Sequence, residues 1–290
     1  MRWLVVGADG MLGQDVVGLL RERGEEVRTA GRDAVAAAEI LDITDAQACL
    51  AVITGFDVVV NCAAYTAVDA AETDEPQAFM VNAVGAANVA RAARRSGARL
   101  VHISTDYVFG GTATTPYPED GALKPVSAYG RTKGAGEWAV RAECPDHLLV
   151  RTAWLYGAGG ACFPKTIARV AAERDGIDVV DDQVGQPTWT ADLADLILRL
   201  VAAAAPAGTY HGTSSGQVSW HGFAQHVVAA AGLDPEIVRP TTSAAFVRPA
   251  PRPTYSVLGH DALAAVGVRP IGAWDERWSV ASAEVLGARV

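Results

Sequence analysis

The chain begins with the stretch that decides its fold, Met1-Arg-Trp-Leu-Val-Val6 followed by Gly7-Ala-Asp-Gly10-Met-Leu-Gly13. The apolar run predicts a buried strand, and the apolar residues between Val16 and Leu20 predict a helix after the glycines. A strand, a glycine turn and a helix in this order form the context of a dinucleotide site. Glycines let the backbone approach a pyrophosphate, and the helix N-terminus offers free N–H groups. The spacing is G-x-x-G-x-x-G rather than the commoner G-x-G-x-x-G, so an ordinary strand-to-helix turn is the alternative.

Tyr129 and Lys133 form the second informative pattern. They stand four positions apart in Ser127-Ala-Tyr-Gly-Arg-Thr-Lys133, so on a helix both side chains lie on one face. A phenol has an ordinary pKa of about 10, and a nearby ammonium group would lower that pKa. The pair would then provide a proton donor and acceptor for an alcohol or ketone. The alternative is an exposed tyrosine beside a solvated lysine.

Strand and helix patterns alternate through the first half of the chain. The strand candidates are Trp3–Val6, Glu26–Ala30, Val58–Asn61, Leu100–Ser104 and Leu148–Arg151, and the helical patterns are Val16–Arg23, Pro76–Ser96 and Tyr129–Glu143. This alternation predicts an α/β fold, a Rossmann-like doubly wound parallel sheet with helices on both faces. Because ligands of such sheets bind beyond the carboxyl ends of the strands, the turns Gly7–Gly13, Cys62–Val68 and Ser104–Gly111 should meet in one crevice.

After about residue 155 the pattern loosens, and proline and glycine become frequent, as in Phe246–Pro253. We interpret residues 1–155 as the dinucleotide-binding domain, to which residues from about 189 to 205 return. Residues 156–290 are interpreted mainly as a smaller C-terminal substrate-binding lobe. Such a lobe would close the crevice over a substrate, and interfaces between domains are common sites for small ligands.

Composition and charge narrow the class of protein. Hydrophobic residues make up 50% of the 290 residues, which is enough for a substantial core. The net charge of −9 argues against nucleic-acid binding. We find no signal-peptide pattern and no apolar stretch long enough to span a bilayer, and therefore expect a cytoplasmic protein with no membrane partner. Four cysteines without C-x-x-C spacing favour reduced thiols over a disulfide framework or zinc site: Cys49, Cys62, Cys144 and Cys162.

Several longer motifs extend nearly from end to end. They are Gly7–Gly13, Asn61–Glu72, Val81–Gly85, Ser104-Thr-Asp-Tyr-Val-Phe109, Tyr129 to Lys133, Arg151–Trp154, Asp181-Asp-Gln-Val-Gly-Gln-Pro-Thr188 and Arg252-Pro253. In these motifs the chain resembles the extended short-chain dehydrogenase/reductase family, and within it the reductases of dTDP-4-keto-6-deoxy sugars. The runs Ser104–Phe109 and Asp181–Thr188 are far more specific than the glycine turn.

The resemblance implies an NAD(P)H-dependent oxidoreductase that reduces the C4 ketone of a dTDP-4-keto-6-deoxy sugar. The leading reaction is dTDP-4-dehydro-L-rhamnose to dTDP-L-rhamnose. The resemblance gives Tyr129 the role of general acid toward the carbonyl oxygen. It gives Lys133 two roles, to lower the pKa of Tyr129 and to hold the nicotinamide ribose. The Thr105 hydroxyl is implied to bond the same oxygen. Donors placed where negative charge develops lower the barrier.

The resemblance also implies which residues bind the two ligands. The cofactor residues are Gly7, Gly10, Met11, Leu12, Gly13, Arg32, Asp42, Ile43, Ala63, Ala64, Tyr65, Tyr129 and Lys133. The substrate residues are Val68, Thr105, Asp106, Tyr107, Tyr129, Trp154 and Arg252. Tyr107 and Trp154 could instead be core aromatics, Arg252 a solvated loop arginine and Asp42-Ile43 a plain strand end.

The segment Val27-Arg-Thr-Ala-Gly-Arg-Asp33 favours NADPH as the cofactor. An acid at the end of the second strand would bind the ribose 2′-hydroxyl of NADH, whereas a nearby arginine would accept the 2′-phosphate of NADPH. No acid precedes Gly31, and Arg32 comes before Asp33. We therefore expect NADPH to be preferred and NADH also to be used.

Two departures from the family pattern leave the sugar open. Gly110-Gly111 stands where the family has Asp-Gly, and Cys162-Phe163 where it has Asn-Phe. A sulfhydryl hydrogen-bonds more weakly than an amide, so the sugar or its stereochemistry could differ. The alternatives are a 4-ketoreductase for another dTDP-deoxysugar of a natural-product pathway, a nucleotide-sugar epimerase or dehydratase, and a non-catalytic regulatory subunit. A homodimer is possible; some relatives bind magnesium at a dimer contact, but Asp15 here is a lone acid and we expect no metal.

Overall fold

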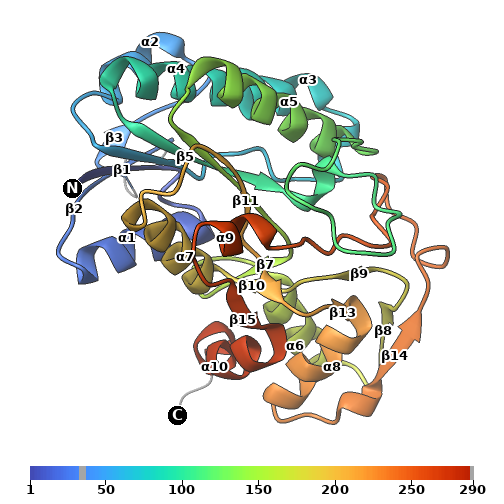
Figure 1. Cartoon of the computed structure of the whole chain (residues 1–290). Coiled ribbons are helices and arrows are strands. Elements are labelled where there is room, and N and C mark those ends of the chain that lie inside the picture. Colours follow the sequence, from blue (N-terminus) through green and yellow to red (C-terminus); the bar gives the residue numbers. More distant parts are fainter. Residues whose placement is uncertain (33–36, 288–290) are drawn as a thin grey trace.

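The computed structural model describes residues 1–32 and 37–287, which form a parallel sheet of seven strands with a second group of elements at one end (Figure 1). The strand order is β11 (Gly208–His211), β6 (His147–Thr152), β5 (Arg99–Thr105), β4 (Val58–Asn61), β1 (Arg2–Val6), β2 (Glu26–Gly31) and β3 (Glu39–Ile40). All neighbouring strands are parallel. The chain adds strands on one side of β1 and then on the other, so a topological switch point lies between β1 and β4. This is where such sheets bind dinucleotides.

The predicted α/β, Rossmann-like fold is confirmed. Each of the five strands expected from the sequence is present, with ends within two residues of those expected. Strand β3 was not predicted because two residues give little periodicity, and β11 was not predicted because Gly-Thr-Tyr-His is not an apolar run. The helix expected at residues 76–96 is divided into α3 (Glu75–Phe79), a π-helical turn η2 (Met80–Gly85) and α4 (Ala86–Ser96).

The side chains of alternate strand residues pack into two separate hydrophobic cores, one on each face of the sheet. Trp3 and Val5 of β1 face helices α1 (Met11–Glu22) and α7 (Thr190–Ala202). Leu4 and Val6 face the opposite layer, which contains α2 (Ala46–Val52), α4 and α5 (Ala128–Glu143). Figure 1 shows these two layers on either side of the sheet. A strand buried on both faces explains why β1 is apolar throughout rather than alternating.

The second group of elements has a core of its own around Tyr156, Phe223 and Trp278. Its helices are α6 (Phe163–Glu173), α8 (Trp220–Ala230) and α10 (Trp274–Leu286), and α9 (Asp261–Ala265) packs against the main sheet core. Its short strands pair as β7 (Leu155–Tyr156) with β10 (Thr188–Trp189), β8 (Ile177–Val180) with β14 (Val238–Thr241), β9 (Val184–Gly185) with β13 (Val218–Ser219), and β12 (Ser214–Ser215) with β15 (Ile271–Ala273). The boundary proposed at residue 155 remains a prediction.

Candidate active site

The carboxyl ends of the central strands open into one cleft with a cavity volume of about 930 Å³. This lies near the upper end of the range of roughly 300 to 1,000 Å³ for ligand sites and has room for a cofactor together with a substrate. Most of the predicted site residues line it: Gly7, Gly10, Met11, Leu12, Gly13, Arg32, Asp42, Ile43, Ala63, Ala64, Tyr65, Val68, Thr105, Asp106, Tyr107, Tyr129, Lys133 and Trp154. The structure therefore brings together residues from both halves of the predicted site, and their individual roles remain predictions.

The glycine turn is shaped by close backbone contacts. Gly7 has a φ of +74°, and a Cβ atom there would lie 2.6 Å from the backbone nitrogen of Ala63. A Cβ atom on Gly13 would lie 2.2 Å from the carbonyl oxygen of Gly7. Side chains at these two positions would push the turn away from β4 and from α1. The glycines thus keep the N-terminus of α1 open to the cleft, where its free N–H groups fit a pyrophosphate.

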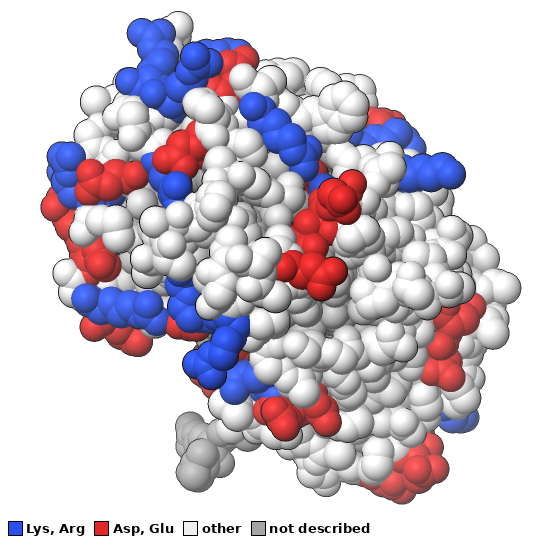
Figure 2. Space-filling view, viewed as in Figure 1, with Lys and Arg blue, Asp and Glu red and all other residues white. Residues whose placement is uncertain are grey.

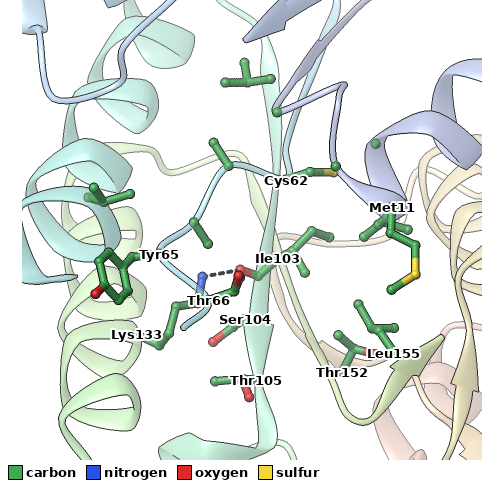
Figure 3. A pocket seen from close by; sticks show the side chains of 18 of the residues that line it. Met11, Cys62, Tyr65, Thr66, Ile103, Ser104, Thr105, Lys133, Thr152 and Leu155 are labelled. Atoms are coloured by element: carbon green, nitrogen blue, oxygen red, sulfur yellow. Dashed lines mark hydrogen bonds between the residues drawn. The ribbon is translucent and has the colours of Figure 1, made fainter. Parts of the chain in front are cut away.

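Helix α5 positions Tyr129 and Lys133 opposite the end of β5. The hydroxyl of Ser127 accepts a hydrogen bond from the Gly130 N–H (3.1 Å) and so caps the helix just before Tyr129. Nζ of Lys133 donates to the carbonyl oxygen of Ile103 over 2.6 Å. Figure 3 shows Lys133 reaching across to Ile103, Ser104 and Thr105 on β5, with Met11 and Leu155 on the other side of that strand. The predicted shared face of Tyr129 and Lys133 is therefore directed at the cleft.

The electrostatics of the Tyr129 phenol differ from the expectation. Burial raises its pKa, the Asp106 carboxyl adds to the increase, and the Thr105 hydroxyl opposes it. The Lys133 ammonium was expected to lower this pKa, but it is bonded to the Ile103 carbonyl oxygen instead. Burial also lowers the pKa of Lys133 to about 8, against the charges of Glu137 and Cys62. A phenol with a raised pKa stays protonated near neutral pH and remains a proton donor.

Asp106 is a buried carboxyl group at the base of the cleft. Its Oδ1 accepts a hydrogen bond from the Thr105 hydroxyl (2.9 Å), whereas its buried Oδ2 has no hydrogen-bond partner. Burial raises the pKa of Asp106 to about 6, although the hydroxyls of Ser256 and Thr105 act in the opposite direction. The Thr105 hydroxyl also accepts from the Tyr107 N–H (3.2 Å). Asp106 therefore fixes the direction in which Thr105 donates.

On the cofactor side, Arg32 stands at the end of β2 with an exposed side chain that lines the cleft. Asp42 also lines the cleft, and its Oδ1 accepts from the backbone N–H and the hydroxyl of Thr44 (2.9 and 2.8 Å). These hydrogen bonds lower the pKa of Asp42. Asp33 lies outside the described residues. Asp9 of the glycine turn, which has no predicted role, lines the same end of the cleft.

Arg252 is the one predicted site residue that does not line the cleft within the described ranges 1–32 and 37–287. Its guanidinium group lies 6.0 Å from the centre of the Tyr107 ring, and Nη2 bonds Oδ1 of Asp69 over 2.8 Å. It is therefore an ion-paired residue at the rim behind Tyr107 rather than a solvated loop arginine. Asp69 was not predicted as a site residue, although it follows Val68 in a motif quoted above.

Asn82 organises the segment after β4. Its Oδ1 accepts from the Tyr65 N–H (2.8 Å), and its Nδ2 donates to the Tyr65 carbonyl and to the Thr132 hydroxyl (3.1 and 3.0 Å). One buried amide thus joins the π-helical turn, the Ala63–Tyr65 segment and α5. The motif around Asn82 was visible in the sequence, but the contacts that give it a role are tertiary.

A buried ion pair supports the strand end that carries Thr105. Glu137 Oε1 accepts from the Ser104 hydroxyl (2.7 Å) and from Arg151 Nε (2.8 Å). Arg151 Nη2 bonds Oε2 over 2.8 Å, and Nη1 donates to the Glu119 carbonyl over 3.0 Å. Burial alone would raise the pKa of Glu137, but Arg151 and Ser104 lower it overall. Removing one partner of such a pair typically costs about 3 to 5 kcal/mol.

The remaining expectations concern metals, thiols and surface charge. Within residues 1–32 and 37–287 there is no group of three or more His, Cys, Asp or Glu side chains that could hold a metal ion. Asp15 has one oxygen without a hydrogen-bond partner, and burial raises its pKa.

The four cysteines are free thiols, and Cys162 Sγ lies 3.7 Å from the Gly157 carbonyl. No helix in the described part of the chain is long and apolar enough to cross a membrane. Figure 2 shows acidic and basic side chains interspersed on the visible face.

Known proteins with this arrangement are similar over almost the whole chain. A dTDP-4-dehydrorhamnose reductase of Streptomyces griseus is 49% identical over 280 residues, covering 94% of this chain and 90% of that protein. A dTDP-4-keto-6-deoxy-D-glucose reductase of Streptomyces niveus is 47% identical, covering 94% and 93%. The crystal structure of a dTDP-4-dehydrorhamnose reductase from Bacillus anthracis in complex with NADP has a TM-score of 0.91 and 36% identity, covering 97% and 98%.

A glycine turn at the switch point of a Rossmann-type sheet, facing a Tyr-x-x-x-Lys helix, defines an oxidoreductase of the extended short-chain dehydrogenase/reductase class. Within that class, residues 1–286 match the family described as RmlD substrate binding domain, and the chain belongs to this family. The resemblance inferred from the sequence is thereby confirmed.

Proposed function

We propose that the protein reduces the C4 ketone of a dTDP-4-keto-6-deoxy sugar, with dTDP-4-dehydro-L-rhamnose as the leading substrate and dTDP-L-rhamnose as the product. The observation that carries this proposal is that Tyr129, Thr105 and Lys133 line the same cleft as the glycine turn. The names of the Streptomyces relatives support a nucleotide sugar as substrate. The NADP complex of the Bacillus anthracis structure supports NADPH as cofactor.

The cleft fits a dinucleotide in shape and in donor groups. The open N-terminus of α1 and the Gly7–Gly13 backbone would hold the pyrophosphate, and Arg32 would bind the 2′-phosphate of NADPH. The small side chains of Ala63 and Ala64 leave room beside β4. Lys133 would hold the nicotinamide ribose. The bound cofactor supplies the hydride.

The protein's own groups handle the charge that develops on the ketone oxygen. Tyr129 donates its phenolic proton to this oxygen, which becomes the product hydroxyl. The Thr105 oxygen is held beside the phenol by its hydrogen bonds with Asp106 and with the Tyr107 N–H. Its single proton is donated to Asp106, and rotation of the hydroxyl would redirect this proton to the ketone oxygen as negative charge develops there.

The two relatives named above differ in sugar, and this keeps a second substrate open. The Streptomyces niveus reductase is named for a D-gluco ketone and the Streptomyces griseus reductase for dehydrorhamnose. Cys162 replaces the asparagine expected before α6, and this is a reason to test both sugars.

The test is to follow NADPH and NADH oxidation with dTDP-4-keto-6-deoxyglucose, with and without a 3,5-epimerase, and to identify the product by NMR. Oxidation only with the epimerase supports the rhamnose reaction. Oxidation without the epimerase would still support a reductase, but it would point to a different 4-keto sugar as the substrate. No oxidation in either arm would contradict the proposal; a copurifying stoichiometric cofactor would then favour an epimerase, and a stable hetero-complex without turnover would favour a regulatory subunit.

A further inference from the structure

Trp154 has an unusual backbone conformation for its residue type. Its φ is +47°, a region that residues other than glycine rarely adopt. It lies between β6 and β7, and it lines the cleft that also contains Tyr129 and Thr105. Such a conformation persists only where the surrounding structure imposes it, and it is frequent at ligand sites. The contacts that impose it therefore bear on the shape of the cleft.

The first of these contacts is a face-to-face stack with Trp220. The two ring centres lie 3.5 Å apart and the planes differ by 8°. Trp220 begins α8 and packs against Phe163 of α6, with 4.4 Å between ring centres. Its backbone N–H donates to the Gln183 carbonyl over 3.4 Å, and the preceding Ser219 caps the helix through Gly222. The second group of elements thus fixes Trp220 from several sides.

The second contact is with Gly185, where the Trp154 ring occupies the space that a side chain would need. A Cβ atom there would lie 2.5 Å from Cε2 of Trp154 and 2.8 Å from its Nε1. Gly185 has no positive φ, so its backbone alone would tolerate alanine. It pairs with Val218 on β13, the strand that leads directly into Trp220. Gly185 and Trp220 therefore form one receptacle for the Trp154 ring.

We propose that Trp220 is a positioning residue that, together with Gly185, holds Trp154 against the sugar ring and thereby sets the sugar selectivity. This inference rests on the proposed function. Trp220 does not line the cleft and acts only through Trp154. A flat indole held in one orientation presents a rigid apolar surface, which suits the less polar face of a 6-deoxy sugar. The stack itself consists of Trp154, Trp220 and Gly185 and includes no residue of the Gly7–Gly13 turn.

The first experiment compares Trp220→Leu and Gly185→Ala with Trp274→Leu. Trp274 lies in the same group of elements, packs edge-on to Phe223 at 6.0 Å and does not line the cleft, so it controls for general loss of stability. We expect the first two variants to raise KM for the preferred 4-keto sugar by about tenfold, as expected for loss of an aromatic pair. They should also bring the kcat/KM values for the two 4-keto sugars closer together. The affinity for NADPH should stay within twofold of the wild-type value. Trp274→Leu should change neither KM nor that ratio.

A spectroscopic measurement distinguishes loss of the Trp154–Trp220 stack from a general loss of folded structure. Indoles fixed by packing contribute to the near-UV circular dichroism of the folded protein, and the Trp154–Trp220 stack should contribute to this signal. Trp220→Phe should change the signal strongly, Gly185→Ala should alter it, and Trp274→Phe should change it least. Because both changes act on one ring, the KM effects of Trp220→Leu and Gly185→Ala should be less than additive in the double variant.

The outcomes separate this inference from the proposed function. A wild-type protein that oxidises NADPH with neither sugar contradicts the proposed function. Wild-type turnover together with an unchanged KM and sugar ratio in Trp220→Leu would overturn the role of Trp220. If Trp220→Leu does not fold, Gly185→Ala and Trp220→Phe carry the same test, and unchanged sugar kinetics in both would overturn it equally.

Discussion

Oδ1 of Asp69 lies 2.8 Å from Nη2 of Arg252, although 183 positions separate the two residues in the chain. The same oxygen accepts from the Ala250 backbone N–H over 3.2 Å, and Arg248 lies 3.7 Å from the other oxygen. Three residues later in the same turn, Glu72 accepts from the N–H of Ala128, at the start of the helix that carries Tyr129. One short segment thus anchors both a C-terminal loop and the start of α5.

Asp69→Asn should weaken binding of the nucleotide sugar. A neutral amide cannot hold the guanidinium as an ion pair, and partly exposed pairs contribute up to about 1 kcal/mol, which corresponds to a roughly fivefold rise in KM. Steady-state kinetics should show little change in kcat or in KM for NADPH. The matched control is Asp178→Asn, which breaks an exposed pair with Arg239 (3.0 Å) away from the cleft. Equal effects of the two variants would rule out a role for Asp69 in the site.

Arg32→Ala should reduce the preference for NADPH over NADH. A charge-assisted hydrogen bond contributes roughly 1.5 to 3 kcal/mol, so kcat/KM for NADPH should fall by about 10- to 100-fold while the value for NADH is almost unchanged. Arg28→Ala is the control, because Arg28 lies on the same strand, pairs with Glu39 and does not line the cleft. An unchanged cofactor ratio in Arg32→Ala would show that another group binds the 2′-phosphate.

Tyr129→Phe should remove the proton donor and keep the ring. General acid catalysis contributes about 10² to 10⁴ in rate, and kcat should fall by a factor in this range. NADPH binding, followed by nicotinamide fluorescence, should be close to that of the wild type. Tyr210→Phe removes a hydroxyl that donates to the Pro206 carbonyl (2.8 Å) and should leave kcat unchanged. Near-normal turnover in Tyr129→Phe would refute the assigned mechanism.

The buried ammonium of Lys133 predicts an alkaline limb in the pH profile. Its pKa is lowered to about 8 by burial, so the charged form is lost as pH rises through this value. The kcat/KM for ketone reduction should therefore decline above about pH 8. The effect on folding stability has the opposite sign. Between about pH 8 and the ordinary lysine pKa of about 10.4, the unfolded chain binds this proton and the folded chain does not. Folding stability therefore rises with pH in this range. A wild-type profile that stays flat to pH 10 would contradict this assignment.

Asp106→Asn should stabilise the fold at neutral pH. Burial raises the pKa of Asp106 to about 6, so the folded state binds more protons than the unfolded state between pH 4 and 6, and stability falls as pH rises through that range. Asparagine removes the buried charge and can still accept from Thr105. Denaturant unfolding at pH 7 should show a gain of roughly 2 to 3 kcal/mol, and this gain should vanish below about pH 4. A destabilised variant at pH 7 would contradict the destabilising effect assigned to the buried Asp106 charge.

The parts of the site that the sequence predicted are those that depend on nearby positions. The glycine turn follows from a strand, a turn and a helix within twenty residues, and the shared face of Tyr129 and Lys133 follows from helical spacing. The Glu137–Arg151 pair could not be predicted, because it requires α5 to lie across β5 and β6. The positive φ of Trp154 and the upward pKa shift of Tyr129 likewise arise from packing and burial. The π-helical turn that divides one helical pattern contains Asn82, whose hydrogen-bond partners lie 17 and 50 positions away.

The central sheet is completed by residues from far along the chain. Strand β11 covers the edge of β6, and α7 supplies Leu193, Leu196, Ile197 and Leu200 to the core beneath β1. During synthesis, a nascent chain that has emerged only to residue 155 would have an unpaired strand edge and a bare apolar face. Such surfaces aggregate readily and are bound by chaperones. Translation to about residue 211 is therefore needed before the first half can reach its final structure on the ribosome.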